Sequence, residues 1–590
     1  MGDARSNQPG LRRRAVLAGA GGALCSTAGC VQRARNVLGR DSTSQLSLRI
    51  LTLPTDANPF SARIARSLAE NLRRCGIDAQ IEPADYEAIL RRVLINGDFD
   101  LYVGQFGRAD WTDPDQLYSL LHSAYASESG WQNPFRYTDL DLDGHLETQR
   151  TAAGIARERA VRSIQRTIAE TQPFTTLAFP DSLATVRVDR FRNWTGVPGD
   201  PLALLGVESA PTASASTLRV VTNDGRITAN WNPLAVEFRN RGPFIDLLYD
   251  SLARRVDGER RPWLAADWTV ERSEGLHATV DLREGAEWHD GKPIDAGDVA
   301  FTYRFLADTS LGSAETAVPS PQFRGRTSLV DSVSVRDDRT VRLSFAEAAE
   351  AVAERALTIP ILPEHVWRER TDPATLAGLD ANRAATEALI GNNPGPVGSG
   401  PLRFDSATVD QRLALSVVDD HFLFGSDPPV DVGGSLPYDE LVVRVAGSDE
   451  SAVELVASGG ADATVSPLGP SVVPRIGRET GLRLLAAGSR AFYHVGYNTA
   501  EAPLSNTRFR QVVAGLIDKQ RVVSDVFEGY AMPAASPMHG TDWLAPGLEW
   551  DGADPATPFF GERGDLDAAS ARATLADAGY QYRDGDLLTE

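Results

Sequence analysis

The chain has 590 residues, of which 42% are apolar and 24% are charged, a composition typical of soluble globular proteins. This length exceeds what one hydrophobic core usually serves, so we expect two or more lobes. The 80 acidic residues outnumber the 59 basic ones and give a net charge of −21, which argues against nucleic-acid binding because phosphates require a basic surface.

The acidic excess favours a protein adapted to high salt, because salt screens the repulsion between surface carboxylates. All basic residues except Lys292 and Lys519 are arginine. An arginine-biased, GC-rich genome is the alternative explanation, but it accounts for the scarcity of lysine and not for the excess of acid.

Residues 1–30 have the features of an export signal. An arginine run at 12–14 precedes a weakly apolar segment too short to span a bilayer, and small residues lead to Cys30. The segment resembles a twin-arginine signal ending in a lipobox, which would leave Cys30 lipidated and residues 31–45 as a tether on the outer face of the cytoplasmic membrane. The alternative is an ordinary cleaved leader with an incidental cysteine.

From Leu48 onward, strand-like and helix-like segments alternate. A helix is predicted where apolar residues recur four apart, from Phe60 to Leu72, and Gly76 ends it. A second helix is predicted over 86–95. Three apolar segments flank these helices: LRILTLP, IDAQIEP and FDLYVGQF. Strands joined through helices run parallel, so this region predicts a largely parallel, helix-covered sheet.

The following segments complete the predicted organisation. We expect a helix over 144–170 and strands in TTLAFP and LATVRV. Residues 206–216, GVESAPTASAS, are small and polar without periodicity, which predicts a linker. Strands such as TLRVVTN, HATVDLRE, TVRLSF and ELVVRVA follow, with helices at 297–307 and 451–458, and a helical pattern resumes from Asn506 to Gly529.

The most specific segment is 263–306, WLAADWTVERSEGLHATVDLREGAEWHDGKPIDAGDVAFTYRFL. It predicts a strand, a tight His-Asp-Gly turn, and a helix with Asp295 at its N-cap and Asp298 in its first turn. It resembles the signature of the solute-binding proteins of peptide and nickel ABC importers, of the oligopeptide- and dipeptide-binding type. Further segments match in the family's manner: ILPEHVW, PVGSGPLRF, GGADATV and YNTAEAPLSNTRFRQVVAGLIDKQRVV.

The order of the segments differs from the family's usual order. In the family, a segment like AGYQYRDGDLL at 578–588 is followed by a strand, an amphipathic helix and an aspartate-rich loop. Here similar elements lie near the other end, in LSLRILTLP, LAENLRRCGIDAQIEP and GRADWTDPDQLYSLL. The chain therefore resembles a circular permutant with a haloarchaeal-like composition, and the alternatives are a fusion of gene fragments or a faulty gene model. The permutation predicts that Leu587 and Leu588 lie close to residues 46–50.

The resemblance implies an α/β, two-lobed, periplasmic-binding-protein-like fold with a hinge and a ligand cleft between the lobes, circularly permuted in this chain. Lobe I would comprise 217–494 and a returning segment at 175–205. Lobe II would combine 46–174, which is the family's C-terminal portion, with 495–590.

The resemblance also implies a ligand site. The segment FGRADWTDP matches the loop that, in oligopeptide-binding members, places a carboxylate against the α-amine of the ligand, and the matching residue is Asp110. Gly107 and Arg108 could pair their backbone with an extended peptide, and Trp111 would be a wall or a core residue. The alternative for Asp110 is a turn or N-cap carboxylate. The Arg108 side chain could bind a ligand carboxylate, or pair with Asp110 and block the amine site.

On the other lobe, the segment NWNPLAVEFRNRGPF corresponds to a loop at the cleft border, with Phe238 and Asn240 as candidates, and Phe179 is a further candidate on the returning segment. No cofactor is expected. The scattered histidines exclude a clustered metal site, and Cys75, the one cysteine beyond the leader, excludes an internal disulfide.

The expected function is the capture of a peptide or other small solute and its delivery to the transmembrane subunits of an ABC permease by a monomeric, lipid-anchored protein. The turn His289-Asp290 resembles an acid/base pair, but this turn is structural in the family and no nucleophile accompanies it, so we do not expect an enzyme. Two alternatives stay open: an oligosaccharide-binding member of the family, and a structural or sensory lipoprotein that has lost the cleft.

Overall fold

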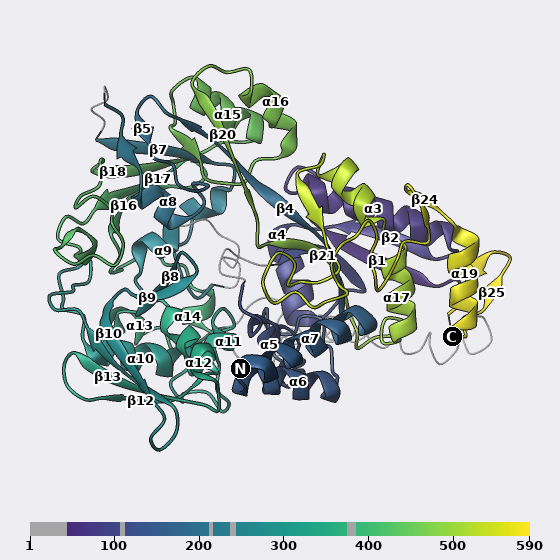
Figure 1. Cartoon of the computed structure of the whole chain (residues 1–590), viewed down its shortest axis with the longest axis horizontal. Coiled ribbons are helices and arrows are strands. Elements are labelled where there is room, and N and C mark those ends of the chain that lie inside the picture. The colour runs from purple at the N-terminus through teal and green to yellow at the C-terminus, as the bar shows by residue number, and fades with distance from the viewer. Residues whose placement is uncertain (1–43, 107–111, 212–215, 236–243, 375–384, 590) are drawn as a thin grey trace, which may run out of the picture.

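The computed structural model describes residues 44–106, 112–211, 216–235, 244–374 and 385–589. One twelve-stranded mixed sheet extends through the whole molecule (Figure 1). Its main path has the order β16-β17-β18-β7-β19-β4-β21-β3-β1-β2, and β20 and β22 also pair with β4. The strands in that order are Leu402–Thr408, Arg412–Val417, Glu440–Val445, Thr217–Thr222, Ala463–Thr464, Phe174–Arg187, Phe492–Tyr497, Leu101–Phe106, Ser47–Thr52 and Asp78–Pro83, with β20 at Leu482–Gly488 and β22 at Ala531–Pro533.

The described residues form two bodies with separate hydrophobic cores. One core gathers side chains between Val186 and Val465 and defines the first body. The second body has two apolar clusters on opposite faces of β1, β3 and β21, because successive side chains of a strand point to opposite faces. Leu48 and Ile50 of β1 belong to one cluster and Leu51 to the other. The expectation of an α/β protein with two lobes is confirmed.

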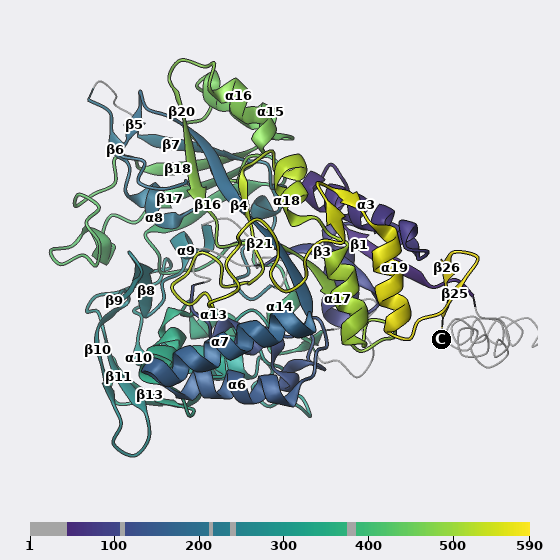
Figure 2. The same ribbon diagram turned by 45° about the vertical axis from the view of Figure 1, so that its right-hand side comes forward.

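Helices cover both faces of the sheet in the second body (Figures 1 and 2). They are α3 (Pro59–Arg74), α4 (Tyr86–Leu90), the π-helical turn η1 (Arg91–Asn96), α5 (Gln116–Leu121), α6 (Leu140–Thr151), α7 (Gly154–Thr171), α17 (Thr507–Gly515), α18 (Lys519–Arg521), the π-helical turn η8 (Val522–Val526) and α19 (Ala568–Asp577). Both β2 and β3 run parallel to β1, which lies between them. The parallel strand-helix-strand order predicted for 48–106 is confirmed.

The first body adds a four-stranded antiparallel sheet with the order β10-β11-β13-β12, formed by Ala265–Glu271, His277–Leu282, Thr340–Phe345 and Val330–Val335. Its helices are α8 (Pro201–Leu205), α9 (Phe244–Leu248), α10 (Ala296–Ala307), α11 (Arg324–Thr327), α12 (Glu350–Ala353), the 3₁₀ turn η5 (Glu354–Thr358), α13 (Glu364–Trp367), α14 (Glu387–Ile390), α15 (Asp449–Ala457) and α16 (Val473–Ile476). The predicted cap of α10 is confirmed, since Asp295 and Asp298 form a reciprocal capping box.

Short antiparallel pairs complete the structure. They are β5 with β6 (Phe191–Arg192, Glu208–Ser209), β8 with β9 (Ala253–Val256, Glu259–Pro262), β14 with β15 (Pro373–Ala374, Ala385–Thr386), β23 with β24 (Gly561–Glu562, Asp565–Leu566) and β25 with β26 (Tyr582–Arg583, Asp586–Leu587). The pairing of β6 with β5 makes part of the predicted linker 206–216 ordered. Its residues Val207 and Ala210 are buried, which the polar composition did not predict.

Both ends of the described chain meet in the second body. The N–H of Leu46 donates to the carbonyl of Leu587 at 2.7 Å, and Gln45 forms an antiparallel bridge with Leu588. The N–H of Leu587 donates to the carbonyl of Gly76 at 2.9 Å. The predicted proximity of Leu587 and Leu588 to the 46–50 region is confirmed.

Two predicted elements differ from the structure. The helix predicted over 144–170 is two helices, α6 and α7, because Ala152 and Ala153 are extended and Gly154 has a φ of +56°, a left-handed conformation that glycine adopts without strain. The segments TTLAFP and LATVRV, predicted as two strands, form the single strand β4.

Candidate ligand site between the two bodies

The strand β4 links the two bodies as one continuous element (Figure 2). Its first half pairs with β21 and β22 in the second body, and its second half, from Asp181 to Arg187, pairs with β20. The strands β20 and β21 are themselves joined by only the three residues 489–491. The chain therefore passes between the two bodies twice, side by side, along β4 and along β20 with β21. A small change of twist at this crossing would rotate one body against the other.

Phe179 lies at this crossing. Its ring centroid is 5.3 Å from that of Phe492 and 5.5 Å from that of His539, and its side chain is buried in the second body. The return of the chain to lobe I was predicted at residue 175, which lies inside β4. In the structure, the residues of β4 before Asp181 still pack in the core of the second body. We interpret Phe179 as a core residue of the second body.

Charged groups flank the crossing. The backbone N–H of Asp181 donates to the carbonyl of Tyr530 at 2.9 Å, and burial raises the pKa of the Asp181 carboxyl. Arg490 donates to the carbonyl of Gly540. Burial lowers the pKa of the neighbouring His539, and the positive charge of Arg490 lowers it further, so this imidazole is neutral at physiological pH.

Most of the candidates drawn from the family resemblance lie outside the described residues. They are Gly107, Arg108, Asp110, Trp111, Phe238, Asn240 and Cys30. The structure does describe the residues on either side of these positions. Phe106, at the end of β3, pairs with Phe492, so the last described residue before position 107 lies at the crossing.

A set of asparagines fixes the chain that leads to the second loop. Asn232 donates to the carbonyls of Ala388 and Gly391 at 2.7 and 2.9 Å. Its side-chain oxygen accepts the N–H of Leu234 at 2.8 Å. Asn230 accepts the N–H of Asn393 at 2.9 Å. These buried hydrogen bonds hold residues 230–235 firmly on the first body.

Two aspartates that the sequence analysis did not single out follow the loop after β3. Asp115 is fully buried and receives hydrogen bonds from Gln149 at 2.8 Å and from Arg150 at 2.8 and 3.0 Å. Arg157 binds Asp113 at 2.8 Å. Burial alone would raise the pKa of Asp113, but the guanidinium groups of Arg355 and Arg157 hold it below its ordinary value.

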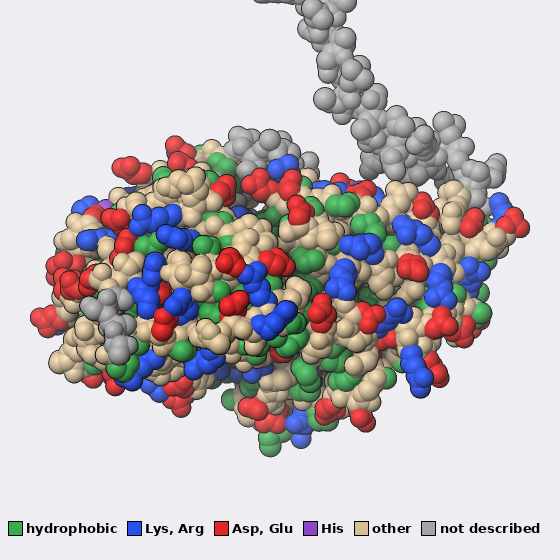
Figure 3. Space-filling model, turned by 90° about the horizontal axis from the view of Figure 1, so that it is seen from above, with side chains coloured by type: hydrophobic (Ala, Val, Ile, Leu, Met, Phe, Trp, Pro, Cys, Tyr) green, Lys and Arg blue, Asp and Glu red, His purple; other side chains and the backbone are tan. Residues whose placement is uncertain are grey.

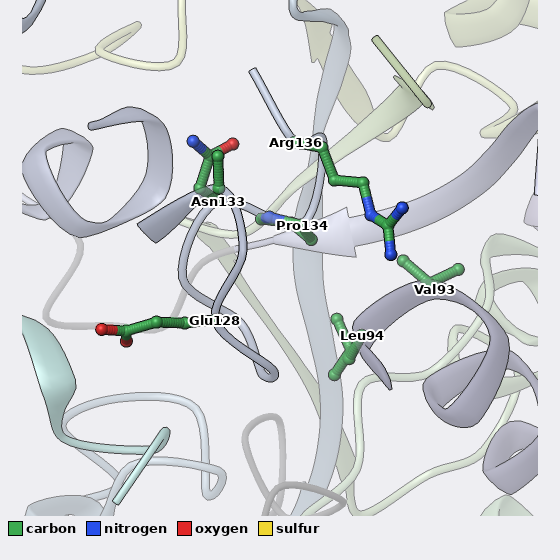
Figure 4. Close-up of a pocket in the computed structure, with 7 residues that line it drawn as sticks. Val93, Leu94, Glu128, Asn133, Pro134 and Arg136 are labelled. Atoms are coloured by element: carbon green, nitrogen blue, oxygen red, sulfur yellow. The ribbon is translucent and has the colours of Figure 1, made fainter. Parts of the chain in front are cut away.

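A small hollow lies beside these segments in the second body (Figure 4). Its lining comprises Val93, Leu94, Ala126, Glu128, Asn133, Pro134 and Arg136. The cavity volume is about 10 Å³, which is space for about one water molecule. This hollow is too small for a peptide.

The described residues contain no group of three or more histidine, cysteine or acidic side chains able to hold a metal ion. In the same ranges, no helix combines the length and apolar character that crossing a membrane requires. Acidic and basic side chains are interspersed over the face seen in Figure 3. His289 accepts the N–H of Gly398 at 3.3 Å and its other ring nitrogen lies 2.9 Å from the carbonyl of Gly400, so the His-Asp-Gly turn serves to join two segments of the first body.

Several known proteins are similar to this chain. The profile of the bacterial extracellular solute-binding proteins, family 5 Middle, matches residues 259–589. "Protein XP55" of Streptomyces lividans is 28% identical over 299 residues, covering 50% of this chain and 48% of its own. "Oligopeptide-binding protein AppA" of Bacillus subtilis is 23% identical over 350 residues, covering 58% of this chain and 56% of its own. A "Putative ABC transporter peptide-binding protein" of Brucella ovis is 24% identical over 337 residues, covering 55% and 56%.

The chain spans about half the length of the curated relatives that it matches. Among solved structures, AppA from Bacillus subtilis in complex with a nonapeptide matches with a TM-score of 0.45 and 18% identity, covering 64% of this chain and 67% of that one. NikZ from Campylobacter jejuni in complex with Ni(L-His) matches with a TM-score of 0.44 and 18% identity, covering 64% and 65%.

Proposed function

Because the chain belongs to the bacterial extracellular solute-binding proteins of family 5, we propose that it is the substrate-binding component of an ABC importer and captures peptide-like solutes for a membrane permease. The observation that carries the proposal is the family match over residues 259–589, which reaches across both bodies. Relatives named as peptide-binding and oligopeptide-binding proteins support peptides as the solute class.

The proposed site lies between the two bodies, next to the place where β4 and the paired strand β21 connect one body to the other. In the proposal, the carboxylate of Asp110 binds the α-ammonium group of the peptide, because a cation taken out of water needs a countercharge. Backbone groups of Gly107 and Arg108 pair with the peptide as an added strand, which provides affinity without selecting side chains. Phe238 and Asn240 border the cleft from the first body.

A thermal unfolding experiment tests the proposal. The full chain is heated at high salt with a mixed peptide pool, with the same pool N-acetylated, and with an oligosaccharide pool. A ligand that binds only the folded state raises the midpoint, so we expect a rise with free peptides that acetylation abolishes. A rise with oligosaccharides alone would replace peptide by sugar, and no rise in a cooperatively unfolding protein would favour a structural or sensory role.

We also propose that the chain is a circular permutant of the family fold. The contacts of Leu46 with Leu587 and of Gln45 with Leu588 support this, because they place the segments joined in the family's usual order side by side. The order of the family segments along the sequence supports it further. A rearranged chain that starts at residue 217, continues to 589 and then runs from 46 to 205 should fold to the same structure, and failure of that chain to fold would count against permutation.

Export and environment complete the proposal. We propose that Cys30 is lipidated after export through a twin-arginine signal, which would hold a monomer at the outer face of the cytoplasmic membrane. Mass spectrometry of the mature N-terminus tests the lipid. We attribute the net charge of −21 to a high-salt habitat. The melting temperature should then fall as salt is removed, and an unchanged value would refute this attribution.

A further inference from the structure

The two bodies make a second contact away from the crossing strands. Figure 1 shows α5 of the second body beside α11 of the first, well separated from β4. The would-be Cβ of Gly325 in α11 lies 2.7 Å from the hydroxyl of Ser119 in α5, so the two helices touch closely. The backbone N–H of Ala349 in the first body donates to the carbonyl of Arg150 in α6 at 2.8 Å.

A buried carboxylate lies at the centre of this contact. Asp115, in the second body, has no exposed surface and binds Arg150 of its own body through two hydrogen bonds of 2.8 and 3.0 Å. Arg355 of the first body forms an ion pair with the same carboxylate. One aspartate is therefore shared between arginines of both bodies, and the side chain of Arg355 is only 11% exposed.

A second ion pair crosses the same boundary. Glu128 of the second body accepts two hydrogen bonds of 3.1 Å from Arg324 of α11. Figure 4 shows the carboxylate of Glu128 pointing away from Val93 and Leu94. Burial alone would lower the pKa of Arg324, but the hydrogen bonds that it donates to the Glu128 carboxylate raise it above its ordinary value. This bidentate geometry is the stronger form of the arginine-carboxylate pair.

The first body fixes the turns that carry its two arginines. Glu354, next to Arg355, receives hydrogen bonds from Trp268 at 3.1 Å and from Arg260 at 3.4 Å. Arg326 of α11 donates to the carbonyl of Thr358 in η5 at 2.8 Å. The turns that carry Arg324 and Arg355 are thus fixed to each other, so the backbone positions of the two arginines are set by the first body alone.

The contact also contains polar atoms without partners among the described residues. They are the side-chain oxygens of Gln132, Ser320 and Gln322, and Gly130 and Pro321 approach each other between them. Burying polar atoms without partners costs free energy, so these atoms favour separation of the bodies.

We propose that Asp115, Arg355, Glu128 and Arg324 form an ionic clasp that holds the two bodies in the closed arrangement even without ligand. Asp115 keeps Arg150 when the bodies part, so opening leaves no unpaired buried carboxylate. Opening returns to water Arg355 and the Arg150 N–H groups that donate to Ser328 and to the carbonyl of Gly325 in the first body. The clasp therefore stabilises closure reversibly. The strength of the clasp sets the fraction of ligand-free protein that is closed. This fraction in turn changes the apparent affinity for the solute.

The distance between the bodies in the ligand-free protein tests the clasp. Spin labels are placed at Ile155→Cys in α7 and Val335→Cys in β12, positions that are 66% and 47% exposed. They are introduced in the full chain with Cys25→Ser and Cys30→Ser. The native Cys75 has no exposed surface and is not labelled. Pulsed electron resonance then gives the distribution of distances between the two labels.

We expect one short distance in the parent protein. In the double variant Arg324→Gln/Arg355→Gln a longer distance should dominate, with the closed-to-open ratio reduced about tenfold or more. The matched control is Arg412→Gln, which removes an arginine of the first body paired with Glu440 of the same body, and its distribution should equal that of the parent.

An unchanged distribution in the double variant would overturn the clasp. Circular dichroism and the melting midpoint establish that each variant is folded. Should the double variant unfold, Arg324→Gln alone leaves the buried Asp115 site intact and must still lengthen the distance. Since no ligand is added, the result does not depend on which solute the protein captures, and the proposed function can fail while the clasp stands.

Discussion

The contact between the two ends of the chain is tested by Leu587→Ala. Leu587 has no exposed surface and belongs to the core of the second body. The substitution removes three carbon atoms, worth about 2.4 kcal/mol of transfer free energy. The cavity left behind costs additional free energy, but the surrounding side chains can partly fill it because Leu587 lies at the edge of the body. We therefore expect a loss of about 3 kcal/mol in the free energy of unfolding.

Thermal unfolding followed by circular dichroism measures the loss. A change of this size should lower the melting midpoint of a unit as large as the second body by roughly 6–12 °C. The control is Leu140→Ala at a position that is 84% exposed, which should change the free energy of unfolding by no more than about 0.5 kcal/mol. Equal midpoints for the two variants would mean that the C-terminal residues do not pack against the N-terminal strand, and the reasoning would be refuted.

Three further predictions follow from single side chains. Asp110→Asn should weaken peptide binding by about 10- to 100-fold in calorimetry without lowering the melting midpoint. Equal affinity would show that Asp110 does not bind the α-ammonium group of the peptide. Lys519 is buried and paired with Asp554. Lys519→Met should therefore lower the free energy of unfolding by about 3–5 kcal/mol, because it leaves a buried carboxylate without a countercharge, whereas Lys292→Met should lower it by at most about 1 kcal/mol. Similar losses for the two variants in urea unfolding would contradict this. Burial raises the pKa of Cys75 to about 11, so with the leader cysteines replaced its thiol should react with a disulfide reagent at pH 8 only after unfolding, and rapid reaction of the native protein would show that it is accessible.

The local elements could be predicted from the sequence because their signals are local. The periodic apolar residues of α3, the capping aspartates of α10 and the alternating strands each depend on neighbours within a few residues. Gly76 shows the limit of this reasoning. It was correctly predicted to end α3, but its would-be Cβ lies 2.2 Å from the carbonyl of Gly585, a close approach that no local pattern reveals.

The contact between the bodies could not be predicted for a similar reason. Asp115 is one of 80 acidic residues and its sequence neighbourhood does not distinguish a buried carboxylate from a solvated one. Its partner Arg355 is 240 residues away along the chain. The break between α6 and α7 was missed because the helical pattern continues across residues 152–154, where only the extended backbone of Ala152 and Ala153 separates the two helices.

Peptide capture by this family 5 protein can be observed by native mass spectrometry of the full chain mixed with the peptide pool. We expect complexes whose added masses equal those of pool members. These complexes should be lost when the pool is N-acetylated. A folded protein that retains no peptide, or that retains acetylated and free peptides equally, would contradict peptide capture through an amine-binding carboxylate.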